Sequence, residues 1–92
     1  MSKLNVYKWS FRGTCPVDRG SDKYDATLKT TETIIVEDLL EWCAKRKEEP
    51  IFQEDWTTDL AYTFAGKVTL VCWHRAGVKI ESSDAPKALE DL

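Results

Sequence analysis

The segment CPVDRGSD, residues 15–22, combines a cysteine with turn-forming residues. Its Pro, Asp, Gly and Ser residues favour a turn, but a turn does not require a cysteine. A thiolate is the strongest side-chain nucleophile near neutral pH, and a nearby protonated carboxyl can supply a proton. Cys15 and Asp22 are therefore candidates for covalent chemistry. Taken alone, each has a simpler interpretation: Cys15 as a buried apolar residue, and Asp22 as a residue that stiffens the turn.

The other thiols and the single histidine form no recognisable metal motif. Cys43 and Cys72 lie far from Cys15 and from each other, no CxxC pair occurs, and His74 is the only histidine. This pattern argues against a structural zinc site and against a disulfide framework, and it indicates free thiols in a reducing compartment. We expect Cys43 and Cys72 in the core. We expect His74, near a hairpin, to be a surface or packing residue.

Length and composition favour one small folded domain. The chain has 92 residues, of which 42% are hydrophobic and 32% charged. The net charge of −3 counts against broad binding to a phosphate backbone, which needs clustered Lys and Arg. No apolar run reaches the roughly 18 residues of a membrane helix, and the first residues have no signal-peptide core. We therefore expect a cytoplasmic protein with no membrane partner.

Period-2 patterns predict strands on both sides of the turn and near the end of the chain. Residues 4–13 and 23–31 alternate, and residues 67–83 form a predicted hairpin with Gly77 in its turn. The apolar residues expected on one face of these strands are Tyr7, Trp9, Phe11, Tyr24, Ala26, Leu28, Val68, Leu70 and Cys72.

Helical spacing appears in the two segments between these strand pairs. In residues 34–49, Val36, Leu40 and Cys43 share a predicted face, and Pro50 ends the helix. Residues 52–66 predict a second helix with Trp56, Leu60, Ala61 and Phe64 on one face and Gly66 at its exit. Glu37 and Glu54 fall in the first turns, where a carboxylate also suits the helix dipole.

The order strand, strand, helix, helix, strand, strand predicts an α+β domain. Two helices can cover one face of a four-stranded antiparallel sheet. We expect residues 1–83 to form a single domain and residues 84–92 a flexible C-terminal tail. The two open sheet edges favour pairing with further copies, so we also expect a homo-oligomer that closes into a barrel.

This ββααββ order is that of the tunnelling fold, or T-fold, whose subunits assemble into barrels. Within that fold, the ordered set CPVDRGSD, VED and FQED resembles the QueF-like family, which acts on the nitrile of 7-cyano-7-deazaguanine. The resemblance covers about residues 11–81. Cys15, Asp22, Glu37 and Glu54 match the family pattern, and Gln53 stands where the family has His.

The resemblance implies a covalent mechanism. Cys15 would add to the electrophilic nitrile carbon to form a thioimide, and Asp22 would supply a proton to the nitrogen. An aspartate is normally ionised at neutral pH, so this role requires burial or a neighbouring anion. Glu54 would accept two hydrogen bonds from the N–H edge of a guanine-like ring, and Glu37 and Gln53 would help to hold the base.

Departures from the family pattern separate three functions. The acidic, leucine-rich VEDLLEWC is a poor partner for a dinucleotide phosphate, and Arg75 only partly matches an Arg-Gly pair of the NADPH-dependent nitrile reductases. The resemblance therefore favours the short amidinotransferase branch, in which ammonia attacks the thioimide to form archaeosine-type formamidine, with no cofactor. The substrate base would be free or carried in a nucleic acid such as tRNA. The alternatives are the nitrile reductase and a non-catalytic module that binds a modified purine.

Overall fold

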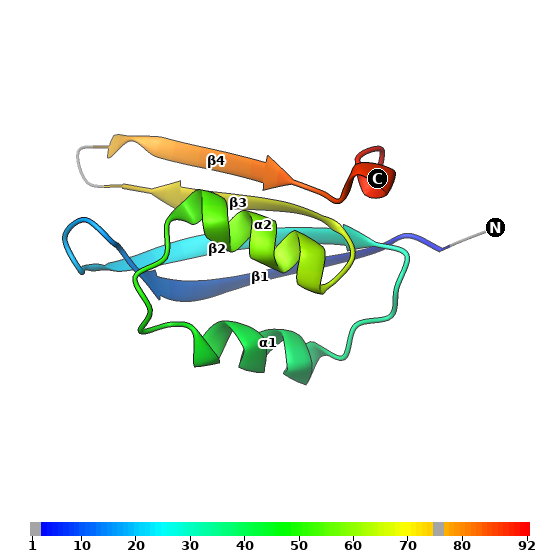
Figure 1. Cartoon of the computed structure of the whole chain (residues 1–92), viewed down its shortest axis with the longest axis horizontal. Coiled ribbons are helices and arrows are strands. Elements are labelled where there is room, and N and C mark those ends of the chain that lie inside the picture. Colours follow the sequence, from blue (N-terminus) through cyan, green and yellow to red (C-terminus); the bar gives the residue numbers. More distant parts are fainter. Residues whose placement is uncertain (1–2, 75–76) are drawn as a thin grey trace.

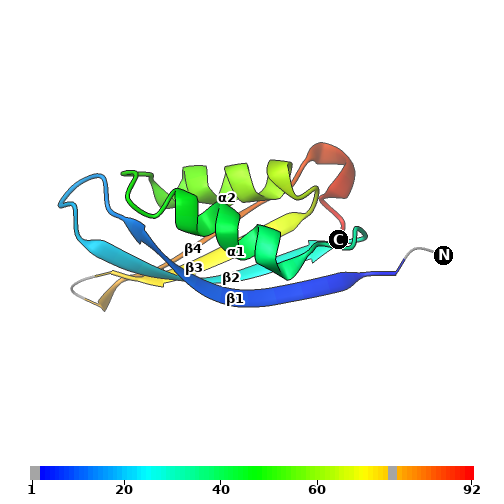
Figure 2. The same ribbon diagram turned by 90° about the horizontal axis from the view of Figure 1, so that it is seen from below.

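The computed structural model describes residues 3–74 and 77–92. Its elements follow the order β1 (Asn5–Thr14), β2 (Ser21–Thr30), α1 (Val36–Lys45), α2 (Gln53–Thr63), β3 (Lys67–Trp73), β4 (Lys79–Asp84) and a short 3-10 helix, η2 (Lys87–Leu89). The strands form one antiparallel sheet in the order β1-β2-β3-β4, and α1 and α2 lie on one face of it (Figure 1, Figure 2). The α+β class and the ββααββ order predicted from the sequence are confirmed.

The face of the sheet beneath the helices forms the core. Side chains along β2 and β3 alternate between this face and the open face, and the buried apolar set is Tyr24, Ala26, Leu28, Val68, Leu70 and Cys72. The β2–β3 register places Ala26 opposite Leu70 and Leu28 opposite Val68. Apolar pairs directly across a ladder stabilise a sheet, so these strands form the centre of the molecule.

Helix α2 packs against β3 and β4 and buries the face predicted for it. Trp56, Leu60 and Ala61 are fully buried, and Phe64 is half-buried. The Trp56 ring centroid lies 4.8 Å from that of Phe11 on β1. Aromatic contacts of this kind contribute packing energy beyond their buried area, and they join α2 to the first hairpin.

Helix α1 buries a narrower stripe than the sequence predicted. Leu39 and Cys43 are buried, whereas Val36 and Leu40 are about half exposed. Among the strands, α1 packs mainly on edge strand β1, so one i,i+4 pair suffices to cover the contact. Trp42 extends toward α2, where its ring meets Trp56 edge-on at 5.9 Å.

The exit from α2 differs from the expected glycine exit. The residue in the left-handed region is Ala65, with φ of 50°, and not Gly66. Gly66 is needed for a different reason, since a Cβ there would lie 2.5 Å from both the Lys29 carbonyl oxygen and Leu28 Cδ1. The absent side chain lets the chain pass closely over β2 as it enters β3.

The C-terminal segment, for which we expected a flexible tail from residue 84, contains the end of a strand and a short helix. Strand β4 continues to Asp84, Ala85 is buried, and η2 follows directly. The Lys67 ammonium donates to the Glu90 carbonyl at 3.1 Å. The buried Ala85 and the short helix that begins after Pro86 thus hold this segment against the end of the sheet. No helix in the described ranges is long and apolar enough to cross a membrane.

Candidate active site

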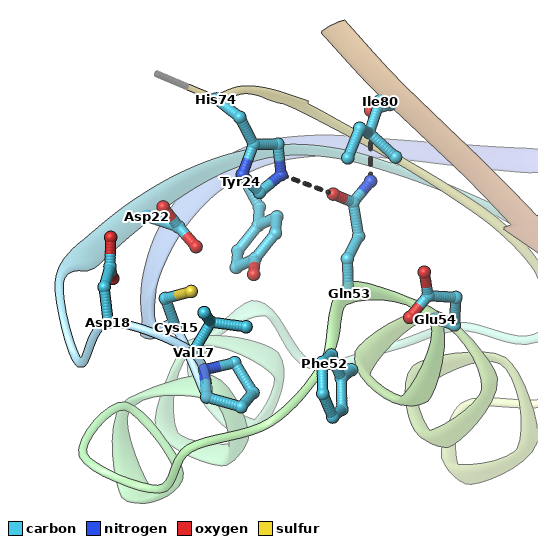
Figure 3. A pocket seen from close by; sticks show the side chains of 11 residues that line it. Cys15, Val17, Asp18, Asp22, Tyr24, Phe52, Gln53, Glu54, His74 and Ile80 are labelled. Atoms are coloured by element: carbon cyan, nitrogen blue, oxygen red, sulfur yellow. Dashed lines mark hydrogen bonds between the residues drawn. The ribbon is translucent and has the colours of Figure 1, made fainter. Parts of the chain in front are cut away.

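A pocket of about 320 Å³ lies where the β1–β2 loop, the start of α2 and the end of β3 meet (Figure 3). Its volume is at the lower end of the range for small-molecule sites, which suits a ligand of nucleobase size. The lining residues are Cys15, Pro16, Val17, Asp18, Asp22, Tyr24, Phe52, Gln53, Glu54, His74 and Ile80.

Cys15 follows β1 directly, and the loop behind it is held by backbone hydrogen bonds. The Cys15 N–H donates to the Gly20 carbonyl at 2.8 Å, and the Arg19 N–H donates to the Cys15 carbonyl at 2.9 Å. The Asp18 carboxylate accepts from the Gly20 N–H at 2.8 Å. The polar residues therefore build the turn, and the half-buried thiol of Cys15 faces the pocket (Figure 3).

Asp22 lines the same pocket from the second position of β2. It shares the helix-facing side of this strand with Tyr24, but it lies at the end of the sheet, where the pocket opens. Its cross-strand partner is Gly13, where a Cβ would stand 3.0 Å from Trp56 Nε1 and 3.1 Å from Tyr24 Cε2. Gly13 thus lets two aromatic rings pack tightly beneath the carboxyl group.

Tyr24 forms part of the pocket wall beside Asp22. Burial raises the pKa of its phenol well above the ordinary value, and the neighbouring Asp22, Cys72, Cys15 and Glu54 add to this shift. The phenol stays protonated throughout the physiological range. It can donate a hydrogen bond to a ligand, but it cannot act as a base there.

Gln53 is buried, and its amide group is fixed by the protein. Its Nε2 donates to the backbone carbonyls of Leu70 at 3.2 Å and Ile80 at 3.1 Å, and it lies 3.1 Å from Ser82 Oγ. Its Oε1 lies 3.5 Å from His74 Nε2. Because the carbonyls can only accept, both amide hydrogens are used within the chain. Gln53 therefore ties α2 to β3 and β4 and turns its oxygen toward His74 (Figure 3).

The rim of the pocket combines one carboxylate with apolar surface. Glu54 is exposed in the first turn of α2, and its carboxylate has no hydrogen bond or ion pair within the described residues. Phe52 and Val17 are 53% and 82% exposed, and Ile80 lines the opposite side of the pocket, near the Gln53 amide (Figure 3). Exposed apolar side chains around a free acceptor suit a flat ring with an N–H edge.

Glu37 does not join this pocket within one chain. It is exposed in the first turn of α1, and α1 begins at the other end of the sheet from the β1–β2 loop (Figure 1). The structure therefore brings Cys15, Asp22, Gln53 and Glu54 together and leaves the fifth predicted residue apart. The family pattern gives the order of these residues along the chain, but it does not show at which end of a helix or of the sheet each one lies.

His74 is the residue that sequence reasoning missed. It lines the pocket, although we expected a surface or packing role. The β2–β3 register pairs Asp25 with Val71, and its continuation would set His74 opposite Asp22. The sequence did contain a signal for this position. His74 follows Leu70 and Cys72 in the series of every second residue, whose side chains face the helices. Arg75, which we compared with the reductases, lies outside the described residues.

The chain is thus a two-layer ββααββ protein with a thiol and a carboxyl group in a nucleobase-sized pocket. Comparisons with protein-family models and with curated proteins give no match. A similar solved structure is that of the archaeosine synthase QueF-Like in the apo form, with a TM-score of 0.75 and 15% sequence identity. The match covers 90% of this chain and 94% of the other. It confirms the T-fold and the structural resemblance expected from the sequence.

Proposed function

We propose that this protein is an amidinotransferase of the QueF-like type, which converts the nitrile of a 7-cyano-7-deazaguanine group to a formamidine. The observation that carries the proposal is that Cys15, Asp22 and Glu54 line one pocket in this fold. Those residues came from two separate sequence segments, CPVDRGSD and FQED. The similarity to an archaeosine synthase supports the same class of reaction.

The first step would join the base to the protein. The Cys15 sulfur adds to the nitrile carbon, one C–N π bond breaks, and the nitrogen takes a proton from Asp22. The product is a thioimide, in which carbon is bonded to sulfur and doubly bonded to N–H. Cys15 and Asp22 line the same pocket from the two ends of one short loop, so both can reach a linear nitrile (Figure 3).

The second step would release the product. Ammonia adds to the thioimide carbon, the carbon–sulfur bond breaks, and the thiol of Cys15 is restored. One nitrile and one ammonia thus give one formamidine, with no change of oxidation state and no cofactor. A reductase would instead need two hydride equivalents, which this scheme does not use.

The residues at the rim of the pocket would recognise the base. The free carboxylate of Glu54 would accept hydrogen bonds from the N–H edge of the purine-like ring. Phe52 and Val17 would cover its faces, since both are exposed at the pocket. Gln53 would act by fixing the pocket wall, because its amide hydrogens are already used. Glu37 would contribute only from a neighbouring copy of the chain in an oligomer.

A product assay tests this function. The protein is incubated with 7-cyano-7-deazaguanine and ammonium, and with a tRNA carrying the nitrile base, and the products are separated by liquid chromatography and mass spectrometry. We expect a formamidine product from one of the two substrates, and none from a Cys15→Ala variant. In a parallel incubation with NADPH, formation of an aminomethyl product with NADPH oxidation would indicate the reductase instead.

A binding module is the second candidate, and Gln53 favours it. A Gln cannot carry a proton at neutral pH, and this one is committed to backbone carbonyls. Under this alternative, Cys15→Ala would leave the affinity for the base nearly unchanged and no product would form with either protein. Isothermal titration with the nitrile base, run beside the product assay, separates the two functions.

A further inference from the structure

Three side chains of different chemistry converge at the wall of the pocket, which Asp22 and His74 line and behind which Cys72 is buried. An oxygen of the Asp22 carboxylate, the Cys72 sulfur and a ring nitrogen of His74 all lie within 4.8 Å of one another. Cys72 is buried, and the other two are half-buried. Asp22 lies on β2, Cys72 lies on the neighbouring strand β3, and His74 directly follows β3, so the three residues form no local spacing motif in the sequence.

Gln53 fixes the orientation of the His74 ring. Its Nε2 is bound to two backbone carbonyls, so its Oε1 is the atom that faces His74 Nε2. An amide oxygen can only accept, and His74 Nε2 must therefore carry the hydrogen. In the neutral ring, the lone pair is then on Nδ1, which is turned to the side of the pocket that holds Asp22 (Figure 3).

This arrangement matches that of metal-binding histidines. A ligating His normally donates its second ring N–H to an oxygen acceptor, which sets the tautomer and the ring angle. Here that acceptor is the Gln53 amide oxygen. A set of one sulfur, one nitrogen and one oxygen ligand suits Zn²⁺ or Co²⁺ rather than Mg²⁺ or Ca²⁺.

We propose that Asp22, Cys72 and His74 form a site for a Zn²⁺-class divalent cation, with a fourth position open to the pocket. In tetrahedral zinc sites the ligand atoms stand roughly 3.3–3.8 Å apart, as bonds of about 2.0–2.3 Å require. The present separations of up to 4.8 Å need only about 1 Å of closure, which side-chain rotation can supply.

The electrostatics of the site also favour a cation. The Asp22 carboxylate places an oxygen within 4.8 Å of the Cys72 sulfur and of a His74 ring nitrogen, so a carboxylate charge would stand beside the bound cation. Cys72 would bind as the thiolate and release its proton to solvent on metal binding. Asp22 bound in this way could not protonate a nitrile, so metal binding and the proposed reaction would exclude each other.

Titration with Co²⁺ alone tests the site, because a Co²⁺–thiolate bond gives a near-ultraviolet charge-transfer band. We expect one Co²⁺ per chain, displaced by one Zn²⁺, with the band present in wild type and lost in Cys72→Ser. His74→Ala and Asp22→Asn should each weaken Co²⁺ binding at least about ten-fold. Cys15→Ala and Cys43→Ser serve as matched thiol controls and should retain the band.

Three outcomes would overturn the site: no stoichiometric binding by wild type, a band that survives in Cys72→Ser, or a band that disappears in Cys15→Ala. Circular dichroism of each metal-free variant shows whether it is folded, and His74→Ala decides if Cys72→Ser is not. The titration uses no nitrile, so it is independent of the proposed function. A chain that binds Co²⁺ but yields no formamidine when it is assayed free of metal would refute only the function, and the converse result would refute only the metal site.

Discussion

The Oε1 atom of Gln53, on α2, lies 3.5 Å from Nε2 of His74, which directly follows β3. The same amide group donates to backbone carbonyls of Leu70 and Ile80, on β3 and β4. One buried side chain therefore joins the helix that carries Glu54 to the sheet that carries Asp22 and His74. The geometry of the pocket depends on this link, because it sets the position of the helix start against the sheet.

Replacement of Glu54 by Gln should weaken binding of the nitrile base. The variant keeps the size of the side chain but loses the charge that strengthens hydrogen bonds from the N–H edge. Such bonds contribute about 1.5–3 kcal/mol, so we expect the dissociation constant to rise about 10- to 100-fold. Isothermal titration measures it. Asp55→Asn, on the same helical turn but outside the pocket, is the control, and equal effects of the two changes would refute the role of Glu54.

Replacement of Asp22 by Asn should slow the covalent step and spare binding. Removal of a proton donor typically costs about 10²- to 10⁴-fold in rate. We expect that loss in the rate of thioimide formation, followed by stopped-flow absorbance, with affinity changed only a few-fold. Asp25→Asn provides the control, since Asp25 lies on the open face of β2 and accepts from Ser10 at 2.7 Å. If the Asp22→Asn variant forms the thioimide as fast as wild type, a group other than Asp22 must donate the proton.

The stability of the fold should fall at alkaline pH because of Cys43. Burial raises the pKa of its thiol from 9.0 to about 11, and this outweighs the opposing effects of Trp9 and Arg46. In the unfolded chain the thiol ionises near its ordinary value, so its contribution is complete below pH 9 and is lost as the pH rises from 9 toward 11. The shift corresponds to roughly 2–3 kcal/mol.

Urea denaturation at several pH values checks this prediction. The free energy of unfolding should decline less steeply above pH 9 in Cys43→Ala than in wild type. The comparison concerns slopes, because the alanine also leaves a small cavity that lowers stability at every pH. Parallel pH profiles for the two proteins would show that Cys43 is not responsible.

A methyl group at position 66 should destabilise the protein strongly. In Gly66→Ala the new Cβ would lie 2.5 Å from the Lys29 carbonyl oxygen, so backbone must move. We expect a loss of about 2–3 kcal/mol or more in the free energy of unfolding, measured by urea denaturation. Ala65→Gly, next to it, relieves a positive φ of 50° and should change stability by less than about 1 kcal/mol. A mild effect of Gly66→Ala would contradict the close approach.

Much of the fold could be predicted from the sequence because its strongest patterns are local. Alternation along residues 23–31 and 67–73 identified the buried face of both central strands, and four-residue spacing identified Trp56 and Leu60 on α2. The α1 face was predicted less well, since the helix packs mainly on an edge strand and buries Leu39 and Cys43 but leaves Val36 and Leu40 about half exposed. Which face of α1 is buried depends on how the helix contacts the rest of the protein, and the apolar spacing of the sequence does not contain that information.

The candidate site was predictable only in part. Cys15 and Asp22 flank one tight loop, so closeness in sequence became closeness in space. His74 reached the pocket through the pairing of β2 with β3, a register that no single segment specifies. Glu37 is separated from the pocket by the length of α1, and its predicted role would depend on a second copy of the chain.

The most direct measurement is the mass of the intact protein after incubation with 7-cyano-7-deazaguanine in the absence of ammonia. We predict that each chain gains the mass of one base, that peptide mapping places it on Cys15, and that Cys43→Ala is modified equally while Cys15→Ala is not. Wild-type protein that binds the base, as titration would show, yet keeps its unmodified mass would contradict the account.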